Sequence, residues 1–521
     1  MNKKLMAACF TMVVLSSFLS HSFAQEIVVN GCNHTCQGHV FAGTDRIRVV
    51  SGSHYITLDG VCIDVADQNN TAAFAIEQGA EVVLTLINKN ALKSGAGCAG
   101  IQGPDGAVLT ITEASTGMLD VVGGMKAAGI GGGSEEDSGI ISIRGGFVNA
   151  RGQGEYGSES GAGIGGGYKG DGANITISGG VIEAMGGTGA AGIGGGYSGS
   201  GYEISITGGI INARSSCDYI SGAGIGGGAG GVGERISIEG GFVTANTYYC
   251  EGATTGAGIG GGMNGEGGFI AIHGGLVYAS AGSDAAGIGS SGDGWDSGDI
   301  EINGGFVVAY GGEWGGAGIG RGCVPGVESY NRIQITGGVT IAEGGYTQNS
   351  HPGGAGIGGC GGRTNNLICI MGGYVHATAG EGGNYGGAGI GSGGAANAGN
   401  IYVKGGRIIA DAGIDDETTY GGAGIGSGGN ALADGIMILG GKVSATGRGN
   451  GAGIGDGERG SGKISIHGGS VVAYNGNADT DAIAGELEYT QGEVISNGKV
   501  LNSNAEPMDD WNYVALSSWY D

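Results

Sequence analysis

Proline is nearly absent from this sequence: the chain has 4 prolines among 521 residues, although 130 residues are glycine. So much glycine would suggest disorder or collagen, but the glycines have no three-residue period, which excludes a collagen triple helix. They alternate with Ile, Val and Ala instead. The chain is therefore expected to be folded and repetitive.

Basic residues are scarce as well. The chain has 22 Lys and Arg against 48 Asp and Glu, which gives a formal net charge of -26. Such a charge repels phosphate backbones and anionic lipid. The composition therefore excludes nucleic acid as an expected partner.

A second long apolar run is absent after the N-terminus. The first run follows Lys3 and Lys4 and ends at Ser22-Phe23-Ala24, the pattern of a secretory signal peptide over residues 1–24. That run is too short for a stable membrane span. We therefore expect a protein that does not span a membrane and that is secreted or displayed on the cell surface, with the periplasm as the alternative.

The letters of a dinucleotide-binding fingerprint, G-x-G-x-x-G, occur in GAGIGGG at residues 161–167. The fingerprint needs a strand that leads into a helix, because the helix N-terminus faces the pyrophosphate. No helical stretch follows, and the central AGIG occurs eleven times, with its Ile at 130, 164, 193, 225, 259, 288, 319, 357, 390, 425 and 454. We therefore interpret the motif as architecture and not as a nucleotide site.

A second motif, I-x-[IV]-x-G-G-x-x-x-A, interleaves with AGIG eleven times, as in ITISGGVIEA at 175–184. Successive AGIG copies lie about 32 residues apart, a period typical of solenoids. Each unit has three short segments of period two, separated by glycine corners. The pattern predicts an all-β fold, a right-handed parallel β-helix of about 12–13 coils with three short strands each.

The repeat divides the exported chain into three parts. Residues 25–126 still alternate but lack intact motifs, and we interpret them as an N-terminal cap with degenerate coils. Residues 127–483 hold the glycine-rich repeats. Residues 484–521 lose the repeat and are expected to form a C-terminal cap, because a solenoid must protect its last open edge.

Alternation predicts which side chains face the core. In one coil these are expected to be Ile175, Ile177, Ile182, Ala184, Ala162 and Ile164. The glycines at 161, 163 and 165 would then point outward and form a stripe without side chains. Such a stripe would either allow the backbone to bend tightly at a corner or serve as a docking face for another surface.

The residues that follow each Gly-Gly form a row whose direction, outward or inward, also has two interpretations. It comprises Phe147, Val181, Ile210, Phe242, Leu276, Phe306, Val339 and Tyr374, then Arg407, Lys442 and Ser470. Strict alternation would make this row an outward apolar ribbon, suited to a ligand or to another chain, so self-association stays open. A glycine corner can instead reset the parity and turn the row inward, and we expect this second arrangement.

The interleaved I-x-I-x-G-G-x-V-x-A and GAGIGGG units resemble the repeats of secreted bacterial glycine-rich β-helix proteins, broadly pectin-lyase-like in fold. This resemblance covers roughly residues 80–483. It implies a carbohydrate-binding or adhesin type of protein, although the fold also hosts lyases and hydrolases.

Loop lengths locate the variable edge of the predicted rod. The spacing from the alanine of [VI]-x-A to the next AGIG Ile differs from coil to coil, so insertions gather on one edge. Aromatic and acidic residues recur there, and flat rings with polar neighbours suit sugars. The candidate binding residues are Tyr156, Tyr219, Tyr248, Tyr249, Trp314, Tyr346, Tyr385, Tyr420, Asp415, Asp416 and Glu417. The partner would be a polysaccharide or a cell-surface glycan; alternatively, the tyrosines only pin glycine loops and the acids confer solubility.

Nine cysteines remain after the leader, and export permits disulfides. Cys217 and Cys250 occupy nearly equivalent positions in adjacent coils, and so do Cys323 and Cys360. Adjacent coils bring such positions within disulfide range, so we predict Cys217–Cys250 and Cys323–Cys360 as staples between coils. We expect Cys32, Cys36, Cys62 and Cys98 to pair within the N-terminal cap, which leaves Cys369 alone.

The chain lacks the full motif set of the enzymes of this fold. The polygalacturonase-like enzymes of the resembled fold share N-x-D, D-D, G-H-G and R-I-K motifs; the D-D pair occurs only twice here, at 415–416 and 509–510, and G-H-G and R-I-K are absent from the sequence. We therefore expect binding rather than catalysis, with a lyase or hydrolase as the alternative and a structural spacer or matrix protein as the third. No cofactor or metal is expected; weak Ca²⁺ binding at Glu135-Glu136-Asp137 or Asp415-Asp416-Glu417 stays open, although a solvated acidic loop is the simpler interpretation.

Overall fold

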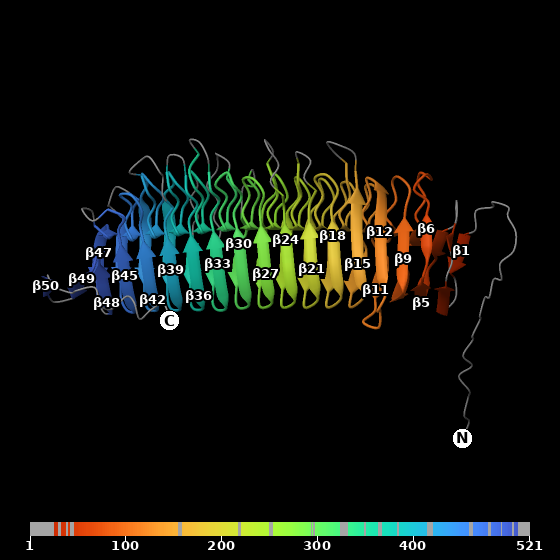
Figure 1. The fold of residues 1–521 in the computed structure, drawn as a ribbon, viewed down its shortest axis with the longest axis horizontal. Helices are drawn as coiled ribbons and strands as arrows, with labels where there is room; N and C mark the ends of the chain where they lie inside the picture. The colour runs from red at the N-terminus through yellow and green to blue at the C-terminus, as the bar shows by residue number, and fades with distance from the viewer. Residues whose placement is uncertain are drawn as a thin grey trace, which may run out of the picture.

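A computed structural model describes residues 26–29, 33–37, 40–41, 46–154, 159–216, 220–248, 254–292, 294, 297–323, 332–347, 351–362, 367–382, 385–413, 420–457, 462–477, 481–490, 492–502 and 505–508. These residues form a rod of stacked coils with three parallel sheets and no helix (Figure 1). The predicted all-β parallel β-helix is confirmed, and so is its coil length of about 32 residues.

Sheet A is built from the AGIG strands, each only two residues long in the repeats. It contains 16 strands. They are β1 (Glu26–Val29), β4 (Arg46–Val49), β7 (Phe74–Ile76), β10 (Ile101–Gln102), β13 (Ile130–Gly131), β16 (Ile164–Gly165), β19 (Ile193–Gly194), β22 (Ile225–Gly226), β25 (Ile259–Gly260), β28 (Ile288–Gly289), β31 (Ile319–Gly320), β34 (Ile357–Gly358), β37 (Ile390–Gly391), β40 (Ile425–Gly426), β43 (Ile454–Gly455) and β46 (Ile483–Ala484).

Sheet B is built from the I-x-I segments and also contains 16 strands. They are β2 (Asn33–Gln37), β5 (Gly52–Asp59), β8 (Ala80–Ile87), β11 (Val108–Ile111), β14 (Ile140–Ile143), β17 (Gly172–Ile177), β20 (Gly201–Ile206), β23 (Gly233–Ile238), β26 (Ile270–Ile272), β29 (Ile300–Ile302), β32 (Arg332–Ile335), β35 (Leu367–Ile370), β38 (Ala398–Val403), β41 (Ala433–Ile438), β44 (Lys463–Ile466) and β47 (Glu486–Tyr489).

Sheet C follows each Gly-Gly corner, and its strands lie side by side along one face of the rod (Figure 1). They are β3 (Val40–Phe41), β6 (Cys62–Asp64), β9 (Lys89–Lys93), β12 (Met118–Met125), β15 (Phe147–Gln153), β18 (Val181–Met185), β21 (Ile210–Arg214), β24 (Phe242–Asn246), β27 (Leu276–Ser280), β30 (Phe306–Tyr310), β33 (Val339–Glu343), β36 (Tyr374–Thr378), β39 (Arg407–Asp411), β42 (Lys442–Thr446), β45 (Ser470–Tyr474), β48 (Glu493–Ser496), β49 (Lys499–Asn502) and β50 (Ala505–Met508). β49 pairs antiparallel with both β48 and β50, whereas β48 still pairs parallel with β45 like the earlier strands of this sheet.

The repeat region supplies the last 12 strands of sheet A, β13 to β46, in line with the predicted number of coils. The region before residue 127 adds four more strands to sheet A and four to sheet B, so the rod is longer than the repeats alone. At the other end, the coil pattern continues through β48, which ends at Ser496.

Ladders of identical aliphatic side chains fill the core. Ile164 pairs in register with Ile193 and Ile175 with Ile204, each stacked on its equivalent in the next coil. The six residues predicted to face inward in this part of the chain are all buried. The period-two pattern therefore identified the core correctly, because successive strand residues point to opposite faces.

The row after Gly-Gly faces outward, so the predicted inward arrangement is wrong. Ile210 is 53% exposed and Phe242 is 46% exposed, whereas the next residues along each strand, Ile211 and Val243, are fully buried. The second glycine of the corner takes a positive φ, as at Gly209 (94°). The corner shifts the alternation by one residue, because Ile206 is buried before it and Ile211 is buried after it. Alternation therefore holds within each strand but not across the corner.

Candidate functional site

The loops that connect sheet C to sheet A form the variable edge of the rod, where they project beyond the strands (Figure 1). When positions are counted backward from each AGIG Ile, one column of this edge stands out. Five residues before Ile319, Ile357, Ile390 and Ile425 lie Trp314, Pro352, Tyr385 and Tyr420. We call these four residues the ring ladder. The same column in the other coils holds Met125, Glu159, Thr188, Ile220, Thr254, Ser283 and Gly449.

Backbone hydrogen bonds hold the ring ladder in register. The amide of Gly353 donates to the carbonyl of Tyr385 at 2.9 Å, and the amide of Gly386 donates to that of Tyr420 at 3.0 Å. The rings of Tyr385 and Tyr420 lie 5.4 Å apart between centroids, tilted by 46°. This tilted arrangement is a favourable geometry for two aromatic rings.

The first part of the ring ladder is fixed in the same way. The amide of Trp314 donates to the carbonyl of Ser283 in the preceding coil at 2.6 Å. Trp314 is 37% exposed, and Pro352, Tyr385 and Tyr420 are half-buried. Four successive coils therefore present a ring at one position, held by backbone and partly open to solvent.

Polar side chains flank these rings. Glu313 precedes Trp314, His351 precedes Pro352, and both side chains are exposed. Nearby, the Thr347 hydroxyl donates to the carbonyl of His351 at 2.6 Å, which fixes the backbone before Pro352. The edge thus combines apolar ring faces with hydrogen-bonding groups.

The remaining predicted binding residues fall into two groups. Tyr346 lies in the same loop as Pro352 and Tyr248 lies on an earlier coil; both are exposed and neither belongs to the ring ladder. Tyr156, Tyr219, Tyr249, Asp415, Asp416 and Glu417 lie outside the described residues.

Pro352 is the member of the ring ladder that the sequence reasoning missed. The candidates on this edge were aromatic and acidic residues, and Pro352 is neither. Counting backward from the AGIG Ile would have aligned the column, since its spacing to that Ile is constant.

The glycine stripe at 161, 163 and 165 is not a surface, so its interpretation as a docking face is wrong. All three glycines are buried. A Cβ at Gly163 would overlap the backbone of Ala184 and Met185, and one at Gly165 would overlap the carbonyl oxygen of Gly194. The stripe is bare because backbone packs directly against it.

The last AGIG glycine of each coil forms what we call the glycine ladder: Gly131, Gly165, Gly194, Gly226, Gly260, Gly289, Gly320, Gly358, Gly391, Gly426 and Gly455. Its members have φ between 124° and 141° and stack in register, as Gly226 does on Gly260. A side chain is excluded there both by the backbone conformation and by the carbonyl of the next coil.

Cys323 and Cys360 lie beneath the first half of the ring ladder. The Sγ atoms of Cys323 and Cys360 both contact the carbonyl oxygen of Gly361, at 3.0 and 3.5 Å. A Cβ at Gly315, next to Trp314, would lie 3.6 Å from the Cys323 sulfur. Adjacent coils therefore bring the two cysteines together, although no two cysteine sulfurs of the described residues lie at disulfide distance; the Cys323–Cys360 bond stays a prediction.

Cys62 and Cys98, two of the four cysteines expected to pair within the N-terminal cap, do not pair with each other. Cys62 is exposed on the outer face of sheet C, whereas Cys98 is buried just before β10. Burial, with a smaller contribution from Glu136, raises the pKa of the Cys98 thiol to about 11. Cys217 and Cys250, the other predicted staple, lie outside the described residues.

The acidic cluster at 135–137 is engaged by its neighbours. Lys169 Nζ lies 3.2 Å from Glu135 Oε1, and Glu136 Oε2 accepts a hydrogen bond from Gln102 at 2.8 Å. Asp137 accepts one from the amide of Asp171 at 2.7 Å. Within the described ranges no three His, Cys, Asp or Glu side chains gather as metal ligands, and the second acidic cluster, 415–417, lies outside them.

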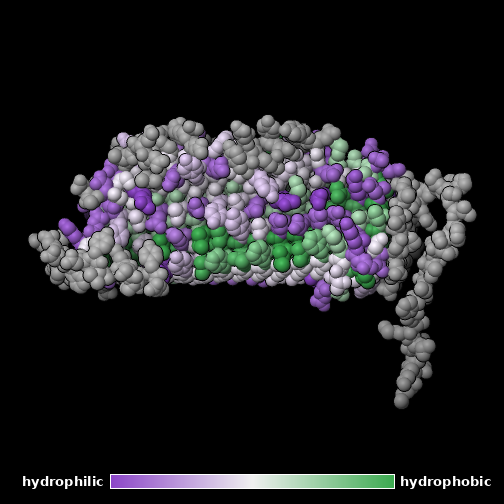
Figure 2. All heavy atoms as spheres, viewed as in Figure 1, coloured by the Kyte–Doolittle hydropathy of each residue, from purple (hydrophilic) through white to green (hydrophobic). Residues whose placement is uncertain are grey.

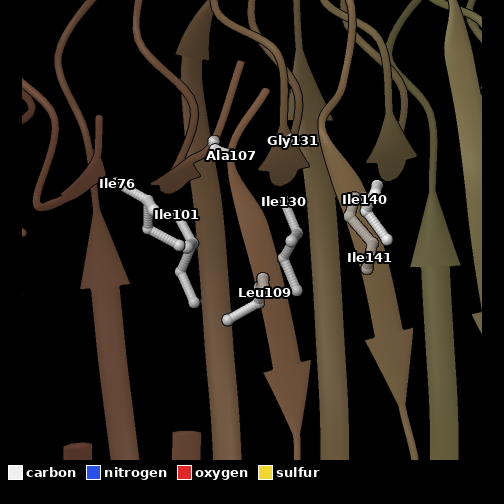
Figure 3. Close-up of a pocket in the computed structure, with 9 residues that line it drawn as sticks. Ile76, Ile101, Ala107, Leu109, Ile130, Gly131, Ile140 and Ile141 are labelled. Atoms are coloured by element: carbon white, nitrogen blue, oxygen red, sulfur yellow. The ribbon is translucent and has the colours of Figure 1, made fainter. Parts of the chain in front are cut away.

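A small pocket inside the N-terminal coils has a wholly apolar lining (Figure 3). Ile76, Ile101, Leu109, Ile130 and Ile141 point into it from successive coils. With no polar side chain in its wall, the pocket is a packing gap in the core rather than a ligand site. In the part of the chain that the structure describes, no helix is long and apolar enough to cross a membrane.

The architecture defines the class of this chain: it is a parallel β-helix, a solenoid of three-stranded coils. More narrowly, seven of its segments match the family model described as a beta helix repeat, namely residues 141–168, 175–197, 204–229, 236–263, 270–292, 300–320 and 436–458. Trp314 lies in the sixth matched segment, and the other members of the ring ladder lie between the sixth and the seventh. No curated protein and no solved structure matches the chain.

Proposed function

We propose that this β-helix is a secreted or cell-surface protein that binds carbohydrate, or adheres to a glycan-covered surface, through the ring ladder on its variable edge. The observation that carries the proposal is the occurrence of Trp314, Pro352, Tyr385 and Tyr420 at one position in four successive coils. Sugar rings have apolar C–H faces that pack on such rings, and hydroxyls that hydrogen-bond to polar neighbours.

The spacing of the rings supports an extended ligand. Successive coils of a parallel β-helix rise by about 4.8 Å. A pyranose unit of an extended glycan has about the same length, so a chain that runs along the rod could place one sugar per coil. Exposed Glu313 and His351 stand beside the rings and could satisfy the hydroxyls.

The rigidity of the edge adds to this proposal. The rings are attached to backbone that is hydrogen-bonded between coils, so little conformational freedom remains to be lost on binding. Pre-organised aromatic surface is an efficient source of affinity for this reason.

A panel of acidic and neutral polysaccharides tests the proposal. Retention of the secreted chain by one of them, without new reducing ends or unsaturated product, supports binding. Product formation would identify a hydrolase or lyase instead. If the panel gives neither retention nor product, a structural spacer remains as the function.

Substitutions then locate the site. Tyr385→Ala and Tyr420→Ala should each weaken binding to the retained polysaccharide about 10-fold, or about 1.4 kcal/mol. Tyr248→Ala is the matched control, because Tyr248 is an exposed tyrosine on the same edge outside the ring ladder. Equal losses for all three variants would contradict a site at the ring ladder.

A further inference from the structure

The outer face of sheet C carries a continuous apolar strip along the middle of the rod, visible as the green band in Figure 2. We call it the apolar strip. Its eight residues follow the Gly-Gly corners of eight successive coils and pair in register: Phe147, Val181, Ile210, Phe242, Leu276, Phe306, Val339 and Tyr374.

The centre of the strip is its most exposed part. Ile210, Phe242, Leu276 and Phe306 are 53%, 46%, 40% and 41% exposed, and the outer members are half-buried. Burying such a side chain completely is worth about 1.5–3 kcal/mol, so leaving four together in water is costly. Contiguous apolar patches on soluble proteins mark interaction sites.

The order of residues in the strip is nearly palindromic. Read outward from the middle, one half is Phe242, Ile210, Val181, Phe147, and the other half is Leu276, Phe306, Val339, Tyr374. A two-fold axis between Phe242 and Leu276 would therefore set Val181 against Val339 and Phe147 against Tyr374. An isologous dimer requires this self-complementarity, because each residue of the patch meets its counterpart twice.

Charged residues bound the strip at both ends. Before Phe147 the row continues with Met118 and Lys89, and after Tyr374 with Arg407 and Lys442. In the symmetric register Arg407 faces Met118 of a second copy, and the two lysines meet only at the solvated ends. A slip by one coil sets Arg407 against Lys89, and a slip the other way sets Arg407 against Phe147.

The rim beside the strip is complementary in the same register. Glu239 and His273 lie three residues before Phe242 and Leu276, and both are exposed. The axis that pairs Phe242 with Leu276 also brings Glu239 of one copy opposite His273 of the other. A carboxylate and an imidazole at this position can share a hydrogen bond.

The area of the face is sufficient for a specific interface. Eight coils at about 4.8 Å span roughly 38 Å, and five strand residues are roughly 16 Å long, so one face covers roughly 600 Å². Two such faces bury about 1,200 Å², the lower end of the range for stable complexes. Sheets of this kind pack face to face about 10 Å apart.

We propose that the apolar strip is the interface of a homodimer in which two antiparallel rods pack face to face about a two-fold axis between Phe242 and Leu276. The ring ladder lies on a different part of the coil, so this proposal does not depend on the proposed function.

Light scattering of the full secreted chain after gel filtration tests the proposal. The wild type should have twice the monomer mass at micromolar concentration, and Phe242→Lys should weaken the dimer at least about 100-fold, because it sets a charge at the axis. Ser470→Lys is the matched control, since Ser470 occupies the same row beyond the charged end of the strip. A monomeric wild type, or a dimeric Phe242→Lys variant, would overturn the proposal.

Mixing experiments test the register. Phe242→Lys mixed with Leu276→Glu should recover dimers, because residue 242 of one copy faces residue 276 of the other. Phe242→Lys mixed with Phe242→Glu should remain monomeric. Recovery in the second mixture instead of the first would show parallel rods in which equal residues meet, and would overturn the antiparallel arrangement.

Discussion

The glycine ladder and the outer face of sheet C belong to the same repeats but tolerate very different residues. On the glycine ladder all eleven positions are glycine, with φ between 124° and 141°. On sheet C the row after Gly-Gly contains Phe, Val, Ile, Leu, Tyr, Arg, Lys and Ser. Both rows stack with one residue per coil.

The difference lies in what covers each row. A Cβ on the glycine ladder would overlap the carbonyl oxygen of the next coil, whereas side chains of the sheet C row stand in solvent. The residue type is therefore the same in every repeat where backbone packs on backbone, and it varies between repeats where side chains extend away from the rod. Function is expected on the rows where the residue type can vary without a cost in folding.

The largest effect is expected from a side chain on the glycine ladder. Gly226→Val should lower the free energy of unfolding by about 4 kcal/mol, because the residue has a φ of 134° and no space for a Cβ. Ser444→Val on the outer face of sheet C should change it by less than about 0.5 kcal/mol. Urea unfolding followed by circular dichroism measures the free energy of unfolding of both variants. Similar urea midpoints for the two variants would contradict the expected difference between the two rows.

The second effect concerns the Cys323–Cys360 pair beneath the ring ladder. Oxidation should form this disulfide and stabilise the rod by about 2–4 kcal/mol, since it closes a loop of about 37 residues between the two positions. Cys323→Ser should remove that gain, while Cys369→Ser, in sheet B, should not alter the response to oxidation. Peptide mapping that finds Cys323 and Cys360 as thiols in the oxidised protein would exclude the staple.

A smaller effect is expected when glycine is introduced on sheet C. Ser444→Gly should cost about 1 kcal/mol, because glycine weakens a strand without creating a clash. The urea midpoint of this variant should lie between those of the wild type and Gly226→Val. A loss as large as that of Gly226→Val would show that the outer face is as constrained as the glycine ladder.

The smallest effect is expected on the reactivity of two cysteine thiols rather than on folding at neutral pH. Cys62 on the outer face of sheet C should react with iodoacetamide at pH 8, whereas Cys98 should stay protected, because burial raises its pKa to about 11. The Cys98 contribution to stability should be constant below pH 9 and decrease between pH 9 and about 11, since the unfolded chain loses its proton first. Mass spectrometry of the alkylated peptides checks this, and equal labelling would refute it.

Much of the fold could be predicted from the repeats. Ile164, Ile175 and Ala184 were correctly assigned to the core, because a strand offers only two faces and alternation selects one of them. The assignment of Phe147 and its row was wrong, because the parity across a Gly-Gly corner depends on the φ of the second glycine, which the residue type leaves open.

The candidate site could be predicted only in part. The sequence identifies Trp314, Tyr385 and Tyr420 as ligand-binding candidates from their place on the variable edge. It does not predict that they align with Pro352. Insertions of different length separate these residues from the preceding strand. Their common position follows from the strand that comes after them.

The sequence by itself determined the solenoid period, the three strands of each coil and the inward rows of Ile and Ala. The tertiary structure alone decided that the glycine stripe is buried, that the row after Gly-Gly is exposed and that four rings form one column. The physical reason is that alternation is a local property of a strand. What lies above a strand depends on the neighbouring coil, which is a full repeat away along the chain.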